Sequence, residues 1–208
     1  MMNCRLTRGQ AQCNRLAIAA AGLFCVCIGR KGPQACQQEE AASRGSPILG
    51  KVAPDFTLSD QHHNLVTLSQ LAGQWVVLCF YAQDDTPGCT CQATEFTELL
   101  SLLRQMNACV YGISGQSVGS HEAFIYAYDL GLDLLSGTGH GVMEQHGAWG
   151  DARLGDKRNG RVIGTTMIID STGIIRYHWP KLVSAGHAQR VRYKLADRQA
   201  QVTFKAPS

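Results

Sequence analysis

The apolar run at residues 75–81 (WVVLCFY) and the segment after it constrain the fold most strongly. An uninterrupted apolar and aromatic run is typical of a central strand that is buried on both faces. From position 96 onward, apolar residues recur at the spacing i, i+3, i+4, i+7, which predicts a helix over residues 89–105. A buried strand that leads into a helix indicates an α/β domain, in which helices cover a sheet.

The rest of the chain continues to alternate between strand and helix patterns. Ser117 can cap a helix that runs to about Leu130, and a last helix opens at Ser184. Further strands are expected at residues 56–58, 65–68, 109–114 and 132–135, with a hairpin formed by residues 162–170 and 174–179. We therefore predict an α/β fold with a central mixed β-sheet flanked by helices.

The first 38 residues differ from the remainder of the chain. They hold five of the 19 Lys and Arg residues and none of the 16 acidic ones, and residues 16–28 form a short apolar run. This composition favours a leader, for export or for a plastid-like organelle, over a disordered tail or a misplaced start, which would leave the protein cytoplasmic. We predict a linker over residues 39–50, a domain over 51–203 and a tail over 204–208.

Charge and hydropathy argue against nucleic-acid binding and against a membrane span. The net charge of +3 comes from the leader, so the remainder of the chain is slightly acidic and has no basic stripe. We therefore expect no nucleic-acid binding. No apolar run reaches the roughly 18 residues that a membrane span needs, so we expect no membrane span.

Cysteine usage follows the same division. Five of the nine cysteines lie in the leader, and the body has only Cys79, Cys89, Cys91 and Cys109. Four cysteines are too few for a fold that depends on a disulfide framework. Cys79 lies within the apolar strand and Cys109 begins the next one, so we expect both in the core.

Cys89 has a different setting, in the segment DDTPGCTCQ. It should lie in the first turn of a helix, at the carboxyl end of a central strand, where backbone N–H groups and the helix dipole favour an anion. A thiol in such a place has a lowered pKa and becomes a nucleophilic thiolate. Thr86 can point its hydroxyl into the same pocket. The alternative is a small buried hydrophobic side chain, and we favour the nucleophile.

Several segments also match a known family pattern, namely APDFTLSD (53–60), FYAQDDTPGCT (80–90), GISGQSVGSHEAF (112–124), HGAWG (146–150) and TTMIIDSTGIIRYHW (165–179). Together they resemble a peroxiredoxin of the peroxiredoxin Q or bacterioferritin-comigratory-protein type. The resemblance covers about residues 50–200, which is the whole body of the chain. It implies a thioredoxin-like fold and thiol peroxidase activity.

The resemblance also implies roles for individual residues. Cys89 would be the peroxidatic cysteine, which attacks the O–O bond of hydrogen peroxide or an organic hydroperoxide and becomes a sulfenic acid. Thr86 would hydrogen-bond the peroxide. Thioredoxin or another external thiol would reduce the product. We expect no cofactor, and a monomer or weak dimer.

Two departures from the family pattern bear on activity. Ala82 stands where the family has a proline that shields the thiolate, and Gly164 stands where it has an arginine aimed at the sulfur. Loss of that guanidinium removes a donor to the transition state, and the neighbouring Asp84 and Asp85 make the loss matter more. Arg161 would lie roughly 10 Å away along a strand, so we do not expect it to substitute. A weakened relative that serves as a redox sensor or interaction protein is therefore the alternative function.

A third departure concerns the resolving cysteine, because Thr94 occupies the position five residues after Cys89 where this group usually has it. A bridge from Cys89 to Cys91 would require the first helical turn to unwind, since residues two apart on a helix point in different directions. Cys36 could reach the site only if the leader is retained. We predict a one-cysteine cycle with an external thiol, and resolution through Cys91 after local unfolding is the second possibility.

Other candidate sites are weaker. A metal site at Cys89 and Cys91 lacks a second ligand pair at a suitable spacing, so we expect no metal. The segment SGTGHG (136–141) is expected to be a turn rather than a phosphate loop. The scattered histidines are expected to be surface residues or satisfied polar residues, and Trp149 and Trp179 to serve in packing or an interface.

Overall fold

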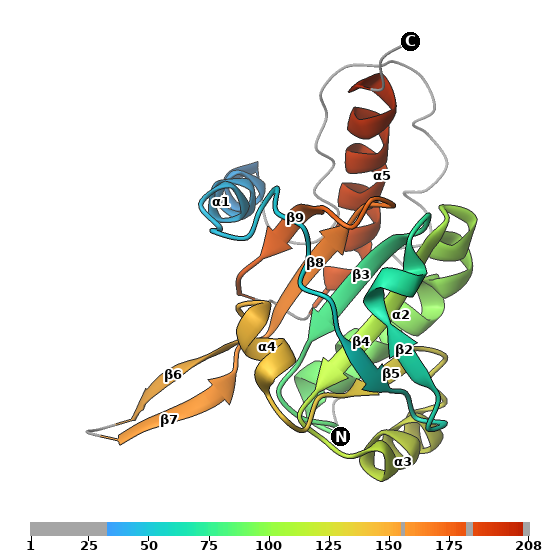
Figure 1. The fold of residues 1–208 in the computed structure, drawn as a ribbon, viewed down its shortest axis with the longest axis vertical. Coiled ribbons are helices and arrows are strands. Elements are labelled where there is room, and N and C mark those ends of the chain that lie inside the picture. The colour runs from blue at the N-terminus through green and yellow to red at the C-terminus, as the bar shows by residue number, and fades with distance from the viewer. Residues whose placement is uncertain (1–32, 155–156, 182–184, 206–208) are drawn as a thin grey trace.

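A seven-stranded mixed sheet forms the centre of the domain in the computed structural model, which describes residues 33–154, 157–181 and 185–205 (Figure 1). The strand order is β2-β1-β5-β4-β3-β8-β9. The strands span Thr57–Ser59 (β1), Leu65–Thr67 (β2), Trp75–Phe80 (β3), Ala108–Ser114 (β4), Asp133–Ser136 (β5), Thr165–Ile169 (β8) and Ile175–Trp179 (β9). Strands β3, β4 and β5 are parallel, and the other pairings are antiparallel. The predicted α/β fold with a mixed central sheet is confirmed.

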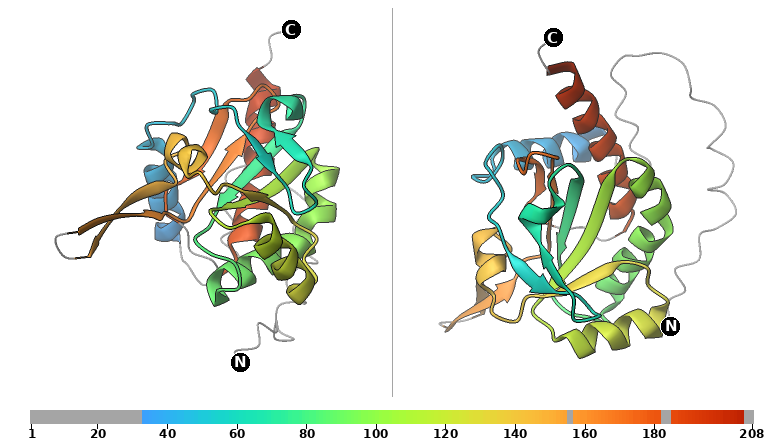
Figure 2. Two further views of the ribbon diagram at one scale, coloured as in Figure 1. Left: turned by 60° about the horizontal axis from the view of Figure 1, so that its bottom comes forward. Right: turned by 45° about the vertical axis from the view of Figure 1, so that its right-hand side comes forward.

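Helices and loops cover both faces of this sheet (Figure 2). The helices span Pro33–Arg44 (α1), Pro87–Gln105 (α2), Val118–Tyr128 (α3), Gly141–Gln145 (α4) and His187–Lys205 (α5), with a 3-10 turn at Leu68–Leu71 (η1). Within the described ranges, no helix combines the length and apolarity needed to cross a membrane.

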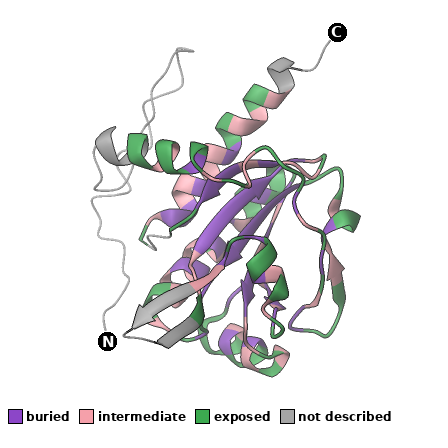
Figure 3. Cartoon of the chain, turned by 60° about the vertical axis from the view of Figure 1, so that its left-hand side comes forward, coloured by how far each residue is buried: buried purple, intermediate pink, exposed green. Residues whose placement is uncertain are grey.

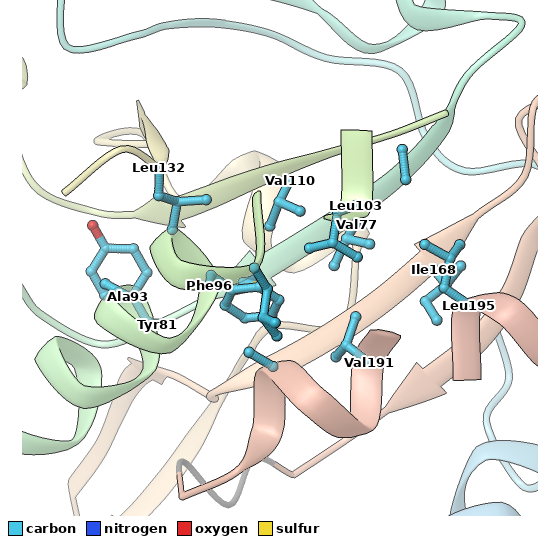
Figure 4. Packing of buried hydrophobic residues seen from close by; sticks show 14 of the residues in the cluster. Val77, Tyr81, Ala93, Phe96, Leu103, Val110, Leu132, Ile168, Val191 and Leu195 are labelled. Atoms are coloured by element: carbon cyan, nitrogen blue, oxygen red, sulfur yellow. The ribbon is translucent and has the colours of Figure 1, made fainter. Parts of the chain in front are cut away.

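The core consists of two clusters, one on each face of the sheet. Val77 of β3, Phe96 of α2 and Val191 of α5 belong to the first cluster, which lies between the sheet and these two helices (Figure 4). The second cluster contains Phe80 of β3 and Met143 of α4 and lies on the opposite face. All six side chains of β3 are buried, as the apolar run predicted. Strand β3 is therefore a fixed platform for the loop that follows it.

Several boundaries differ from the sequence-based expectation, two of them for clear physical reasons. The expected start of the last helix, Ser184, lies outside the described residues, and α5 begins at His187. Helix α2 begins at Pro87 rather than residue 89, because proline at the first helical position loses no hydrogen bond. The expected strand at 162–170 begins only at Thr165. Val162 is instead the last residue of β7 (Lys157–Val162), which pairs antiparallel with β6 (Trp149–Leu154) in an arm that extends away from the domain (Figure 1).

Helix α1 covers the end of the leader expected over residues 1–38 and the first part of the linker expected over residues 39–50, and the boundaries of both stay a prediction. This helix packs against β9 and α5. Glu39 accepts a hydrogen bond from the indole of Trp179 at 3.2 Å, and Glu40 forms an ion pair with Lys194 at 2.9 Å. Its residues from 37 to 44 are mostly exposed or half-buried (Figure 3), and the buried Ser43 accepts a hydrogen bond from the backbone N–H of His178 on β9 at 3.0 Å.

The expected leader and the expected tail lie largely outside the described residues. The tail expected over residues 204–208 contributes residues 204 and 205 to α5. Residues 206–208 lie outside the described residues, as does the predicted leader up to residue 32.

Candidate active site

The loop after β3 and the first turn of α2 together present Cys89. Strand β3 ends at Phe80, and the helix begins at Pro87 with Thr86 as its N-cap residue in an extended conformation. Cys89 is therefore the third residue of a helix that starts at the carboxyl end of a central parallel strand. The N–H groups of a first helical turn have no partner within the helix, so they can bind an anion there.

Cys89 is half-buried, with its apolar side against the first core cluster. It lines a small cavity together with Cys79 of β3, Tyr81 directly after that strand, and Phe96 of α2. The accessible volume of this cavity is only about 10 Å³, at the lower limit for a single water molecule, and its lining is mainly apolar. The thiol therefore has an apolar floor beneath it.

Thr86 lies at the entrance to this helix. Its backbone carbonyl accepts the first helical hydrogen bond, from the N–H of Thr90 at 2.8 Å. Its side chain makes no capping bond and instead donates to the carbonyl of Gln83 at 3.3 Å. The Thr86 hydroxyl is therefore bonded within the loop, three residues ahead of Cys89. Its oxygen does not cap the helix and remains able to accept a hydrogen bond.

Asp84 forms a buried network in the same loop, which the sequence analysis missed. Its carboxylate accepts hydrogen bonds from the hydroxyl of Tyr81 at 2.7 Å and the hydroxyl of Ser120 at 2.6 Å. It also lies 3.0 Å from Nδ1 of His121, and the two side chains are 6% and 0% exposed. The side chain of Gln116 accepts from the backbone N–H of Asp84 at 2.8 Å.

The electrostatics of Asp84 follow from these contacts. Burial raises the pKa of its carboxyl, but hydrogen bonds from His121, Ser120 and Tyr81 outweigh burial and hold the pKa below its usual value. Burial and the nearby carboxylate raise the pKa of Tyr81, so this residue remains a donor. Three side-chain donors therefore surround the charge of Asp84, and that this charge makes the missing cation matter more stays a prediction.

Asp85 is oriented differently. It adopts a left-handed conformation with φ of 56° and is exposed. Its carboxylate accepts a hydrogen bond from the hydroxyl of Tyr128 at the end of α3. This contact lies at the surface, so it holds the loop less firmly than the buried Asp84 network does.

Gly164 lies close to the end of β3. Thr165 pairs with Phe80 and Thr166 pairs with Cys79, so Gly164 comes next to the position of Tyr81. Side chains alternate along a strand, so Thr166 lies on the same side of the sheet as its partner Cys79, which lines the cavity beneath Cys89, and Gly164 lies one residue before β8 begins. The position where the resemblance implies an arginine thus lies just before β8, near the end of β3, and here it has no side chain.

Arg161 and Ala82 are the other two residues singled out around this position. Arg161 is exposed on β7 and pairs with Gly150 in the arm, away from the central sheet. Ala82 is exposed in the loop after β3. That Arg161 does not substitute for the missing guanidinium stays a prediction.

Comparison with known proteins decides the family. Residues 49–178 match the AhpC/TSA family. The chain belongs to the AhpC/TSA family. A putative peroxiredoxin bcp of Coxiella burnetii is 40% identical over 144 residues, which span 69% of this chain and 95% of that relative. A chloroplastic peroxiredoxin Q of Triticum aestivum is 41% identical over 133 residues, which span 64% of this chain and 59% of that relative.

Solved structures of AhpC/TSA proteins agree with this assignment. A PrxQ mutant of Xylella fastidiosa superposes with a TM-score of 0.69 at 28% identity, covering 74% of this chain and 99% of that one. The bacterioferritin comigratory protein of Xanthomonas campestris, solved in relation to its alkyl peroxide reduction, has a TM-score of 0.67 at 27% identity and covers 68% and 90%. The predicted thioredoxin-like fold and the peroxiredoxin Q type are thereby confirmed.

Cys91 of this peroxiredoxin lies one residue beyond Thr90, on a different side of α2 from Cys89. Its thiol is 3.9 Å from a carboxylate oxygen of Glu95. The same Glu95 carboxylate accepts from the N–H groups of Gly186 at 2.7 Å and Ala188 at 3.4 Å, and so caps helix α5. Cys91 is thus located at a packed contact between α2 and α5.

Cys79 and Cys109, the other two cysteines in the body of this AhpC/TSA protein, lie in strands of the central sheet. Cys79 is 3% exposed, as expected for a core residue, and burial raises its pKa to about 12. Cys109 is only half-buried, so its expected place in the core is confirmed in part. Its thiol donates to the carbonyl of Trp75 at 3.5 Å. Neither disulfides nor clusters of three metal-ligating side chains occur in the described part of the chain.

The histidines and tryptophans of this peroxiredoxin have specific partners. His121, His146, His178 and His187 are all buried and hydrogen-bonded, whereas His62 and His63 are exposed. Trp149 stacks on His140 with ring centroids 4.1 Å apart, and Trp179 packs on Tyr177 at 4.3 Å. Residues 137–140 form the expected turn, which leads into α4.

Proposed function

We propose that this peroxiredoxin is a thiol peroxidase that reduces hydrogen peroxide and organic hydroperoxides with Cys89. The observation that carries the proposal is the position of Cys89 in the first turn of α2, three residues after the N-cap Thr86, at the carboxyl end of β3. The N–H groups of this turn stabilise a thiolate, and the apolar floor keeps water from one side of it.

The chemical step is a displacement on oxygen. The Cys89 thiolate attacks one peroxide oxygen, so that an S–O bond forms while the O–O bond breaks. The other oxygen leaves with the electron pair and takes up a proton, which gives water or an alcohol, and Cys89 becomes a sulfenic acid. Thr86 provides a hydroxyl three residues from the sulfur that hydrogen-bonds the peroxide.

Return to the thiol follows a one-cysteine cycle in this proposal. One external thiol condenses with the sulfenic acid to a mixed disulfide and water, and a second thiol releases Cys89 and an external disulfide. Thioredoxin is the proposed reductant, and another external thiol is the alternative. The packed contact of Cys91 with Glu95 supports this cycle, because an internal bridge would disrupt the first turns of α2.

A weakened peroxidase that acts as a redox sensor is the second candidate. Gly164 supports it, since the position where the resemblance implies an arginine has no guanidinium to stabilise the leaving oxygen. Ala82 supports it as well, because an exposed alanine shields the loop less than a proline ring. The two candidates differ in rate and not in the identity of the reacting residue.

Turnover with matched cysteine variants tests the proposal. Peroxide consumption is measured with excess dithiothreitol for the wild-type chain, Cys89→Ser and Cys109→Ser. We expect Cys89→Ser to abolish consumption and Cys109→Ser, which changes a thiol outside the site, to retain it. Retained consumption in Cys89→Ser would overturn the assignment of the nucleophile.

Location and assembly complete the proposal. The plant relatives are chloroplastic by name, which is compatible with a plastid-type leader in residues 1–38. We propose a targeting role for this segment and a monomer or weak dimer for the domain. Fusion of residues 1–38 to a fluorescent protein tests the first statement, and sedimentation of the domain tests the second. Diffuse cytoplasmic fluorescence, or a stable higher oligomer, would contradict them.

A further inference from the structure

The loop between β3 and α2 is attached to α3 through one buried residue, Asp84. The loop supplies Thr86, and its far end leads into the turn that carries Cys89. Asp84 is the buried member of the stretch from residue 82 to residue 88, whose other side chains are exposed or half-buried. The position of this catalytic loop therefore depends on what Asp84 binds.

The partners of Asp84 come from two rigid elements. Tyr81 directly follows β3, and its backbone N–H donates to Ile113 of β4 at 3.1 Å. Ser120 and His121 lie in the first half of α3, whose N-terminus is capped by Ser117 through the N–H of Ser120 at 3.3 Å. Both carboxylate oxygens of Asp84 are used, at 2.6–3.2 Å from their donors.

We propose that Asp84 and His121 form a positioning clamp that holds Thr86 and Cys89 in the geometry required for peroxide attack. The inference rests on the proposed peroxidase function and assigns neither residue a contact with peroxide. Tyr81 links the clamp to the site directly, because its ring lines the cavity beneath Cys89 while its hydroxyl donates to Asp84.

The geometry of His121 fits a positioning role. Nδ1 supplies the proton that the carboxylate accepts, and Nε2 is buried with no partner among the described residues. A ring that is fixed at one nitrogen and enclosed at the other has few alternative positions. A displacement of about 1 Å at a catalytic group can lower a rate by as much as about 100-fold, so a rigid support matters for the reaction.

Two substitutions at position 84 separate positioning from packing. Asp84→Ala removes every acceptor of the clamp, whereas Asp84→Asn keeps the shape and can still accept from Tyr81 and His121. We expect the second-order rate constant for Cys89 oxidation by hydrogen peroxide to fall about tenfold or more in Asp84→Ala. The rate constant of Asp84→Asn should lie between that of the wild type and that of Asp84→Ala. Asp85→Ala, in the same loop but at the surface, is the matched control and should stay within about twofold of wild type.

The combination of Asp84→Ala and His121→Ala tests whether the two residues act as one unit. All rates are measured well below each variant's melting temperature, and Asp84→Asn replaces Asp84→Ala if the latter does not fold. A clamp predicts that the double variant is no slower than the slower single variant, since both changes remove one link. Rate losses that multiply in the double variant would overturn the clamp and indicate independent packing effects.

The outcome for the clamp is distinguishable from the outcome for the peroxidase. If Asp84→Ala and Asp84→Asn oxidise as fast as wild type while Cys89→Ser is inert, the clamp is wrong and the peroxidase stands. If Cys89→Ser still consumes peroxide, the peroxidase assignment itself fails, and the clamp fails with it.

Discussion

Thr165 of β8 pairs with Phe80, the last residue of β3, and this register brings Gly164 beside the loop that leads to Cys89. Position 164 is therefore close to the end of β3, from which the loop to Cys89 begins, even though glycine provides no side chain there. Gly164 does not have a positive φ, so its backbone accepts other residues without strain. The position offers a direct way to ask what a cation does near Cys89.

Gly164→Arg should raise the rate of Cys89 oxidation. A guanidinium at this position would stabilise both the thiolate and the charge that develops on the leaving oxygen. We expect an increase of about tenfold in the second-order rate constant with hydrogen peroxide, measured by stopped-flow fluorescence. Gly164→Met has similar length without charge and should give no increase. Equal rates for the two variants would mean that charge at position 164 has no effect.

Thr86→Val should slow oxidation without destabilising the protein. The substitution removes the hydroxyl that we assign to the peroxide and keeps the shape of the side chain. Thr86 makes no side-chain bond to the helix, so no capping energy is lost, and its bond to the carbonyl of Gln83 is long and exposed, so its loss costs little. We expect a rate constant about tenfold lower and an unchanged melting temperature, and Thr86→Ser should retain the rate. A large drop in melting temperature would assign Thr86 a capping role instead.

Cys91→Ser should leave turnover with an external thiol unchanged. Mass spectrometry after one equivalent of peroxide should find the wild-type Cys89 as a sulfenic acid that a trapping reagent labels. Dependence of turnover on Cys91, or a bridge between Cys89 and Cys91, would contradict the one-cysteine cycle and favour resolution after local unfolding.

Acidification should destabilise the fold through its buried histidines. Burial lowers the pKa of His178 from 6.5 to about 4. The unfolded chain thus takes up a proton near pH 6.5 that the folded chain takes up only near pH 4, so stability falls as the pH drops through this window. His178→Gln should weaken this dependence, because glutamine takes up no proton in this pH range. The variant should still fold, since glutamine can donate to Thr165 and accept from Ser46. The measurement is urea unfolding at pH 7 and pH 5, with exposed His62→Gln as the control. An equal pH dependence in His178→Gln and wild type would contradict the assignment.

The central part of the fold could be predicted from sequence because each signal there is local. The apolar run of β3, the spacing of apolar residues in α2 and the cap Ser117 are each read within one element. Helix α1 has no comparable apolar face, since its sequence is PQACQQEEAASR. It depends on ion pairs with α5, such as Glu40 with Lys194, more than 150 residues away along the chain. No pattern within residues 39–50 indicates such a partner.

The sequence predicted part of the candidate site and missed the Asp84 network. Cys89 and Thr86 follow from the strand-to-helix transition and the family resemblance, whereas the Asp84 network joins residues 37 positions apart. One signal was present: His121 and Phe124 share the inner face of α3, and a buried histidine must find a hydrogen-bond partner. Which residue would be that partner depends on the packing of α3 against the loop, which a single sequence does not reveal.

The second-order rate constant for oxidation of Cys89 by hydrogen peroxide tests the central claim most directly. Stopped-flow fluorescence at pH 7 compares the wild-type chain with Cys89→Ser and with free cysteine in the same buffer. An activated thiolate predicts a signal that is absent in Cys89→Ser and a rate constant well above that of free cysteine. A rate constant no higher than that of free cysteine would contradict the account, because the site would then not activate its thiol.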